Sequence, residues 1–507
     1  MRISPVDLLI IVAYLAGVTL FGAMLRRGQQ TVRDYFLGGR TTPWWALACS
    51  IVATETSTLT IIGTPAIAYA GNLGFLQLVL GYVLARIILC VVLVPQYFQG
   101  EFYTAYQLLE KRFGRHMKRA ASAVFLATRA LAEGVRISAI GKVFSVAFGF
   151  GDRASIAAIT AMTIFYTFEG GMRAVIWTDV MQFALYILGS ITAFFVLLHK
   201  IPGGWTTVTH AAAAAGGKFN MFDFGFSLTQ SYTFWSGLIG GTFLTMASHG
   251  VDQTIVQRLL AARSERESKI ALISSGFIVL VQFALFLVIG VMLFVFAQHY
   301  TLPIPEGDPD RIFPSFIVHY MPVGVVGIVL ASIFAVAMSN ASGSLNSLAS
   351  STVMDFGGHH EGDAKGGTSE ENQEGSFGSP LSRPSLRMTS KHGTTLRRSR
   401  LITLLWGLVL GFLGLVRWGG VLVAGLTIAS ITYGGLLGVF LLGTWNKRAN
   451  QTGALVGFTV GIATMVVVNR LTPLAFTWYV LAGTIVTFTV GSVASAFANS
   501  GRRGALS

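Results

Sequence analysis

Six hydroxyl side chains and one carboxyl group fall within residues 50–63, in the middle of a long apolar segment. The hydroxyls belong to Ser50, Thr54, Thr56, Ser57, Thr58 and Thr60, and the carboxyl to Glu55. Lipid cannot hydrate these groups, so the segment must face other helices or a wet cavity. Hydroxyls and bare carbonyls at a broken helix replace the water shell of a small cation. The stretch therefore predicts half of an ion site, with Gly63 and Pro65 disrupting the helix. The alternative is a polar helix interface in which Glu55 is protonated or salt-bridged.

A second polar stretch, residues 336–347, has six Ser or Asn side chains within residues 339–347. On a helix, Val336, Ser339 and Asn340 lie at positions i, i+3 and i+4 and share one face. Small hydroxyl residues also serve close helix packing. The density of polar groups exceeds what packing needs, and it predicts the other half of the ion site.

Other ionisable residues in apolar segments have two interpretations each. Asp179 either binds an ion or anchors the cytoplasmic end of its helix, and Asp252 with Arg258 is expected to have a structural role at a helix end. His249 either lines a pathway or is a satisfied histidine of the core. An ionisable residue at membrane depth is a candidate functional residue in all these cases.

Four cationic residues, Arg86, Arg129, Arg136 and Lys142, fall within predicted spans. Arg129, Glu133 and Arg136 have the spacing i, i+4 and i+7, which places them on one helix face. This pattern predicts an internal salt-bridge ladder inside the bundle.

The composition identifies the class of protein. Of 507 residues, 53% are hydrophobic and 11% are charged, whereas soluble domains carry about 25% charged residues. Apolar segments of ~20 residues predict about thirteen membrane-spanning helices. The first has no cleavage site and is expected to stay as a helix with its N-terminus outside. Lysine and arginine lie mainly in the loops that this topology places in the cytoplasm, together with the C-terminus.

The charge pattern and the missing motifs exclude other classes. The formal net charge of +14 reflects orientation in the membrane rather than nucleic-acid binding. The sequence has no nucleotide-binding, metalloprotease or nucleophile-elbow motif in a supporting context, so no enzyme activity and no cofactor are expected. Residues 356–400 form a low-complexity insert, which predicts a disordered cytoplasmic loop. The stretches Lys200–Thr233 and His299–Met321 are expected to be external and to hold short surface helices.

Several linked motifs then resemble the sodium:solute symporter family. They are Asp34–Arg40 with Trp44–Trp45, Tyr103–Tyr106 through Lys111–Gly114, Gly170–Gly171 through Asp179, Asp252–Gln253 through Gln257–Arg258, and the serine-rich stretch ending in Leu345–Ser347. The resemblance covers almost the whole chain apart from the insert. It implies the fold of the leucine transporter LeuT, which has two inverted five-helix repeats and discontinuous helices around a midplane site.

The resemblance also implies a domain organisation. An extra N-terminal helix and loop would occupy residues 1–43, and the first repeat 44–198. An external loop would occupy 199–231 and the second repeat, with the insert, 232–442. Two C-terminal helices and a tail would follow in 443–507. The discontinuous helices would be 44–69 and 234–252, with Gly240, Gly241 and Gly250 at the second break.

The family's binding residues can be placed on this sequence. The main sodium site would use the backbone carbonyls of Ala53, Thr56 and Val336 with the side chains of Ser339 and Asn340, where the family usually has Ser or Thr in place of Asn340. A second sodium site, found in some members, would use Asp179, Ser339 and Ser342, but its further serine is Gly343 here. The residues expected at the solute site are Glu55, Ser57, Thr60, Thr245, Ser248 and His249.

The expected function is sodium-coupled import of a small polar organic solute, such as an amino acid or a carboxylate, by alternating access across the plasma (inner) membrane. Thr60, Ser248 and His249 replace the residues that the family's sugar transporters use, which disfavours a hexose. One alternative is a solute sensor that has the transporter fold. Another is a proton-coupled symporter in which Glu55 titrates.

Overall fold

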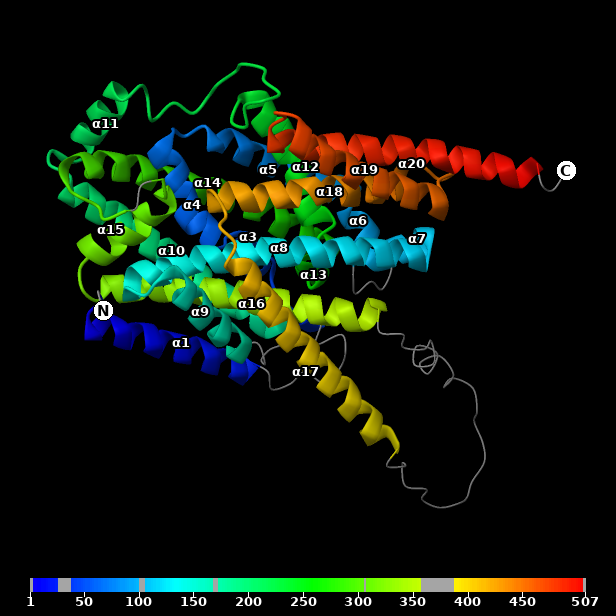
Figure 1. The fold of residues 1–507 in the computed structure, drawn as a ribbon, viewed down its shortest axis with the longest axis horizontal. Helices are drawn as coiled ribbons and strands as arrows, with labels where there is room; N and C mark the ends of the chain where they lie inside the picture. The colour runs from blue at the N-terminus through cyan, green and yellow to red at the C-terminus, as the bar shows by residue number, and fades with distance from the viewer. Residues whose placement is uncertain are drawn as a thin grey trace.

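The computed structural model describes residues 3–25, 38–99, 105–166, 172–304, 307–356 and 387–504. They form a helical bundle in which many of the long helices run along one axis (Figure 1). The elements are α1 (Pro5–Leu25), η1 (Gly38–Arg40), α3 (Trp44–Glu55), α4 (Thr58–Ala70), α5 (Phe75–Val92), α6 (Val94–Tyr97), α7 (Ala105–Phe113), α8 (Arg115–Phe148), α9 (Asp152–Tyr166), α10 (Met172–Lys200), α11 (Gly204–Ala214), α12 (Phe234–Gly250), α13 (Gln253–Leu260), α14 (Glu265–His299), η2 (Pro309–Arg311), α15 (Ile312–Tyr320), α16 (Val325–Phe356), α17 (Arg387–Gly414), α18 (Val421–Trp445), α19 (Gln451–Leu471), η3 (Phe476–Trp478) and α20 (Tyr479–Gly504).

Long apolar helices dominate this bundle. Within the described ranges, seven helical segments are long and apolar enough to cross a membrane, and the bent pair α3 and α4 makes an eighth. The seven are α5, Val175–Lys200, α14, Val325–Ala349, α18, α19 and Phe476–Ser500. Pro5–Val18 and Leu401–Gly414 are shorter apolar helices. The all-helical, multi-pass architecture predicted from the sequence is confirmed, while the number of about thirteen spans stays a prediction.

The first discontinuous helix is confirmed between α3 and α4, which are bent by 65° at the break. Thr56 and Ser57 are both extended there, with ψ of 109° and 177°. The Ser57 N–H donates to Thr60 Oγ1 at 3.4 Å, so a side chain of the second helix satisfies backbone at the break. Gly63 and Pro65 were expected to disrupt the helix, but both lie inside α4. A Cβ on Gly63 would lie 2.7 Å from the Leu422 Cβ, so this glycine serves close packing against α18.

The second discontinuous helix is broken between α12 and α13, at Val251 and Asp252. Gly250 is the last residue before this break, as expected. The expectation for Gly240 and Gly241 is wrong, because both lie in the interior of α12. A Cβ on Gly240 would collide with the backbone of Thr477, and one on Gly241 with that of Leu78. These glycines permit close helix contact, a role that sequence spacing does not distinguish from a break.

Helices α5 and α12 approach each other closely through such glycines, which gives a first prediction. A Cβ on Gly81 of α5 would lie 2.7 Å from the Thr242 backbone nitrogen. Gly81→Val is therefore expected to destabilise the protein by roughly 3 kcal/mol or more, because extra methyl groups meet backbone that cannot move aside. Thermal unfolding in detergent measures the effect. Gly17→Ala is the control, since nothing lies within 4 Å of a Cβ there. An unchanged midpoint for Gly81→Val would show that the two helices are further apart.

Ion pairs connect η2 and the residue before it to α8 and α9, at the end of the bundle where α11 and α15 lie (Figure 1). Lys142 Nζ of α8 donates to Asp308 at 2.6 Å and to Asp310 at 2.9 Å. Arg311 pairs with Asp152 of α9 at 2.6 Å. The prediction of short helices in Lys200–Thr233 and His299–Met321 is confirmed by α11, η2 and α15. However, α15 is not a surface helix, because residues 312–317 are buried.

The chain termini lie at opposite ends of the bundle, with the N-terminus near α15 (Figure 1). Asp7 of α1 accepts from the backbone N–H groups of Gly324 and Gly327, at 2.7 and 2.8 Å, and so joins α1 to the start of α16. The loop predicted over 356–400 is too long, because α17 begins at Arg387; residues 357–386 lie outside the described residues. Basic residues such as Arg397 and Arg398 are good helix formers and extend the apolar helix that follows.

Candidate solute cavity and ion site

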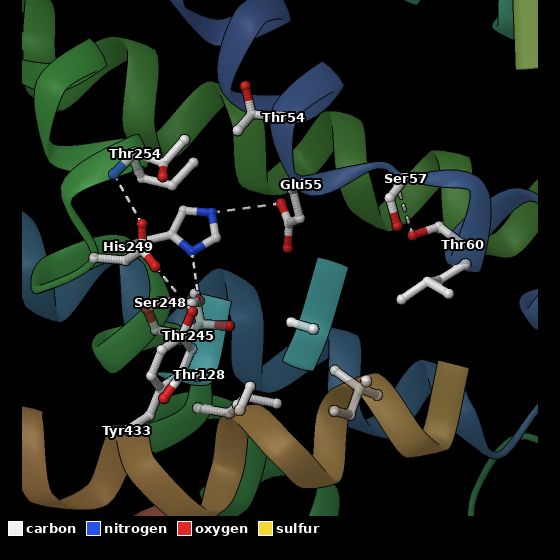
Figure 2. Close-up of a pocket in the computed structure, with 18 of the residues that line it drawn as sticks. Thr54, Glu55, Ser57, Thr60, Thr128, Thr245, Ser248, His249, Thr254 and Tyr433 are labelled. Atoms are coloured by element: carbon white, nitrogen blue, oxygen red, sulfur yellow. Dashed lines mark hydrogen bonds and ion pairs between the residues drawn. The ribbon is translucent and has the colours of Figure 1, made fainter. Parts of the chain in front are cut away.

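A cavity of about 160 Å³ lies between the two broken helices. Helices α3 and α4 line one side, α12 and α13 another, and α5, α8, α14 and α18 contribute the rest. The residues predicted to bind solute all line it: Glu55, Ser57, Thr60, Thr245, Ser248 and His249. Figure 2 shows Glu55 and His249 facing each other, with Ser57 and Thr60 further along. The structure thus brings these residues to one place, and solute binding by them stays a prediction.

Arg86 of α5 holds Glu55 in position. Its side chain is fully buried, and NH2 of its guanidinium forms an ion pair with Glu55 Oε2. Its Nε donates to Ser275 Oγ at 3.1 Å and NH1 to the Tyr82 carbonyl at 3.0 Å. The Glu55 side chain is 16% exposed, so it also reaches the cavity. A buried ion pair of this kind is tolerated at membrane depth because further hydrogen bonds satisfy the guanidinium. Glu55 is therefore salt-bridged, as the alternative interpretation of this stretch included, while the ion site beside it stays a prediction.

His249 extends this network along the cavity wall. Its Nε2 lies 3.0 Å from Arg86 NH2 and its Nδ1 lies 2.9 Å from Ser248 Oγ. A guanidinium only donates hydrogen bonds, so Nε2 accepts from Arg86 and the ring proton resides on Nδ1. The ring is 2% exposed and lines the cavity at the same time. His249 was expected either to line a pathway or to be a satisfied histidine of the core. It does both, because it is buried with its hydrogen bonds satisfied and it also lines the cavity.

The helix break at Thr56 meets α16. Gln282 Nε2 donates to Thr56 Oγ1 at 2.8 Å, and Tyr186 donates to Gln282 Oε1 at 2.9 Å. These contacts occupy the Thr56 side chain and leave its carbonyl to face Asn340, whose Nδ2 lies 3.4 Å away. An amide presents either its nitrogen or its oxygen after a 180° turn. Asn340 thus contacts the Thr56 carbonyl in one orientation and can ligate a cation in the other.

Two further residues of the predicted main sodium site lie in the protein interior. Ala53 and Val336 are buried, 3% and 1% exposed. Ser339 and Ser342 belong to α16, and their side chains lie outside the described residues. The main sodium site stays a prediction, supported by the contact between the helix break and α16.

Asp179 lies in a buried cluster that joins three helices. Its Oδ2 accepts from Ser50 Oγ at 2.6 Å and from Arg258 NH2 at 2.9 Å, and Arg258 Nε donates to Ser50 Oγ at 2.9 Å. The cluster ties α10 to α3 and α13. The ion pair with Arg258 uses one carboxylate oxygen of the predicted second sodium site, which also stays a prediction.

Asp252 has the structural role expected of it. Its Oδ1 accepts from the Thr254 backbone N–H at 2.8 Å and so caps α13. Its Oδ2 accepts from the Tyr433 hydroxyl at 3.0 Å. Asp252 thereby links the second broken helix to α18.

One ion pair of the predicted salt-bridge ladder on α8 is confirmed. Arg136 NH1 donates to Glu133 Oε2 at 3.0 Å. Arg129 Nε donates instead to Ser344 Oγ of α16 at 2.9 Å, and Ser344 donates to Glu133 Oε2 at 2.8 Å. Both arginines line the cavity, whereas Glu133 is 1% exposed behind it. The cavity wall therefore presents the guanidinium groups of Arg129 and Arg136 together with the carboxylates of Glu55 and Asp252.

Residues 35–365 of the chain match the sodium:solute symporter family. This chain belongs to that family. It is a multi-pass, sodium-coupled symporter of small solutes, a transporter rather than an enzyme. Sodium is its coupling ion, and the matches indicate no cofactor.

Three curated relatives are similar to the symporter along most of its length. It is 29% identical over 464 residues to the human sodium/iodide cotransporter, which covers 88% of this chain and 66% of the human protein. It is 29% identical over 502 residues to the sodium/sialic acid symporter SiaT of Proteus mirabilis, covering 96% and 93%. It is 28% identical over 457 residues to the bovine sodium-coupled monocarboxylate transporter 2, covering 88% and 69%.

Solved structures show the same fold. A substrate-bound, outward-open sodium-coupled sialic acid symporter matches with a TM-score of 0.79 and 27% identity, covering 97% of this chain and 98% of that one. The nucleobase–cation symporter Mhp1 matches with a TM-score of 0.51 and 11% identity, covering 93% and 96%. These matches confirm the LeuT-like fold that the sequence resemblance implied.

Several residues of the symporter's site have contacts there that the sequence alone does not indicate. Arg86 carried a signal, because an arginine inside an apolar helix needs a partner, but the sequence did not indicate that the partner was Glu55. Gln282 and Tyr186 carried no distinctive pattern. Arg129 and Arg136 were assigned to a structural ladder, and only their position on the cavity wall shows that a solute can reach them.

Proposed function

We propose that this symporter couples the entry of sodium to the import of a small organic anion of the carboxylate class. The observation that carries the proposal is Arg136, a guanidinium on the cavity wall whose Nε is buried without a hydrogen-bond partner among the described residues. An unsatisfied buried donor is costly, and an anion satisfies it. Guanidinium groups match carboxylates in charge and geometry. Glu55 does not oppose an anion strongly, because Arg86 neutralises it. The wall has a second carboxylate, Asp252, whose charge is matched in number by the second wall arginine, Arg129.

The volume of the cavity limits the size of the solute. About 160 Å³ is comparable to an engineered cavity of 150 Å³ that binds benzene. Leu244, Phe75 and Phe283 add apolar surface to the wall beside its polar groups. The arrangement suits a compact molecule with a carboxylate at one end and a few carbon atoms at the other.

The names of the relatives support an anion. The solutes that they name, iodide, sialic acid and monocarboxylate, are all anionic at neutral pH. The human relative carries iodide, the bacterial relative sialic acid, and the bovine relative a monocarboxylate. The small cavity of this chain argues against sialic acid, and its apolar lining suits a monocarboxylate better than iodide.

In the proposed cycle, sodium binds where the first helix break meets α16. Its ligands are the carbonyls of Ala53, Thr56 and Val336 and the side chains of Ser339 and Asn340. Sodium fixes the broken helix beside the cavity, the anion then binds to Arg136, and the bundle rocks to open inward. The proposed setting is the plasma membrane with about thirteen spans in two inverted repeats, the N-terminus outside and the C-terminus inside. In the same scheme, a second sodium ion binds at Asp179 and Ser342.

The alternatives are less well supported. Proton coupling through Glu55 requires a carboxyl group free to change its partner, and Arg86 engages it here. A solute sensor predicts solute binding without transport. Thermal stabilisation by an anion without sodium-dependent uptake would favour the sensor.

The test is uptake of labelled monocarboxylates by proteoliposomes, with sodium or potassium outside. We expect uptake only with sodium, and we expect Arg136→Gln to raise KM for the anion about tenfold or more, as the loss of a charged hydrogen bond does. Arg417→Gln, at an exposed arginine away from the cavity, is the control. Equal uptake of anionic and neutral analogues, or an unchanged KM in Arg136→Gln, would contradict an anion site at Arg136.

A further inference from the structure

A second, much smaller cavity lies behind the first, between the helix break and α8. Its volume is about 10 Å³, which is room for one water molecule or one small cation. It is lined by Ser57, Thr58, Glu133, Arg136, Ile137, Ile140, Ile159, Ala337, Asn340 and Ala341. The polar residues come from three helices and the helix break, namely α4, α8, α16 and Ser57. Hydroxyl, amide and carboxylate oxygens therefore surround a space of atomic size.

One of these oxygens has no partner. Thr58 is 1% exposed, and its Oγ1 has no hydrogen-bond partner among the described residues. A hydroxyl buried without a partner is energetically costly, so a ligand in the cavity is favoured. Glu133 supplies the negative charge, and its Oε2 accepts from Arg136 and Ser344. Hydroxyl and carboxylate oxygens are the ligands that hard cations prefer.

Arg136 controls the charge of this small cavity because it lines both cavities. While Arg136 pairs with Glu133, the carboxylate is neutralised and a cation gains little there. An anion in the larger cavity attracts Arg136 and weakens its hold on Glu133. The carboxylate is then left with a negative charge beside an unpartnered hydroxyl.

We propose that a sodium ion binds in this cavity between Glu133 and Thr58, and that it does so when the solute anion draws Arg136 away. The exchange of partners rests on the proposed anion site, whereas the cation site itself does not. An anion bound to Arg136 draws away the cation that competes with sodium for Glu133. Sodium bound to Glu133 likewise releases Arg136 to pair with the anion. Each ligand therefore raises the affinity for the other by the same factor. The site is proposed in addition to the one at Asp179 and to the main site; Asn340 lines this cavity and also lies beside the Thr56 carbonyl.

This site changes the electrical balance of transport. One sodium ion with one monovalent anion moves no net charge, so the membrane potential does not drive the cycle. One additional sodium ion adds a charge and with it ~2.3 kcal/mol per 100 mV. Because ~1.4 kcal/mol is a tenfold change, the additional ion raises accumulation about fortyfold at that potential.

Binding of radioactive sodium to the purified, solute-free symporter tests the site without any knowledge of the solute. In the wild type, Arg136 occupies Glu133, so we expect the ion in this cavity to bind at least tenfold more weakly than the ion at the main site. Arg136→Gln removes the competing cation, and one additional sodium ion should then bind tightly. The double variant Arg136→Gln/Glu133→Gln should lose this additional ion. If Arg136→Gln binds the same number of ions with the same affinities as the wild type, the cavity holds only water and the proposal fails.

Thr58→Val and Thr64→Val form a matched pair that keeps the test independent of the charged variants. Both threonines belong to α4, both are buried, and both have an Oγ1 without a partner among the described residues. Thr58 lines the small cavity and Thr64 lines neither cavity. Thr58→Val should weaken the weaker sodium-binding step by about tenfold, while Thr64→Val leaves it unchanged. Equal binding in the two variants would overturn the proposal even if anion uptake still depends on Arg136.

Discussion

Arg86→Met is expected to abolish sodium-driven uptake and to lower the free energy of unfolding by about 3–5 kcal/mol. The substitution keeps the apolar length of the side chain but removes the guanidinium that pairs with Glu55 and contacts His249. Glu55 is then a carboxylate at membrane depth without its main partner. It also adds an uncompensated negative charge to the wall of a cavity that receives an anion. Thermal unfolding in detergent and uptake by proteoliposomes measure the two effects.

The double variant Arg86→Met/Glu55→Gln shows whether Arg86 stabilises the protein through its ion pair with Glu55 or through its other contacts. Removing both partners of a buried ion pair costs far less than removing one. We expect the double variant to recover most of the lost stability. If it is as unstable as Arg86→Met alone, Arg86 stabilises the bundle through its contacts with Ser275 and Tyr82 rather than through Glu55.

Asn340→Leu is expected to lower the apparent sodium affinity about a hundredfold. The leucine side chain has a similar size but no oxygen, so it removes one proposed sodium ligand and leaves the Thr56 carbonyl facing an apolar group. Interactions with a charged group contribute about 1.5–3 kcal/mol each, which corresponds to a tenfold to hundredfold change, and Asn340 borders both proposed ion sites. The dependence of uptake on sodium concentration provides the measurement.

The control for Asn340→Leu is Asn220→Leu, at an exposed asparagine in the segment before α12. It should leave the sodium dependence unchanged. Asn340→Asp offers a further comparison, because it keeps an oxygen at the same position and should retain more sodium affinity than the leucine variant. A sodium affinity that stays within twofold of the wild type in Asn340→Leu would remove Asn340 from the ion site.

Features that depend on local composition could be predicted from the sequence. Hydroxyl residues around Thr56 indicated a polar stretch at membrane depth, and the helix break lies within it, because such side chains compete with helical hydrogen bonds. The sequence also suggested helix breaks at Gly63, Pro65, Gly240 and Gly241, but all four residues lie inside helices. A glycine that disrupts a helix and a glycine that admits a neighbouring helix have the same spacing, and only the neighbour distinguishes them.

Ion pairs between residues on different helices of the bundle could not be predicted from the sequence. Glu55 and Arg86 lie on different helices, as do Asp179 and Arg258, and each pair forms only when the helices pack. The sequence placed Arg136 on the same helix face as Glu133, and the ion pair confirmed it. It did not show that Arg136 borders two cavities, because cavities arise from the space that several helices leave between them. The arginines of the cavity wall were therefore assigned to structure alone.

The most direct measurement of the central claim is a pair of structures of the purified symporter, one in saturating sodium and one in potassium. We expect density for an ion between the helix break and α16 in sodium only, in contact with the carbonyls of Ala53 and Val336 and with the Asn340 side chain turned to present its oxygen. An ion bound elsewhere, or a Thr56–Asn340 contact that is the same in both salts with no ion beside it, would contradict the account.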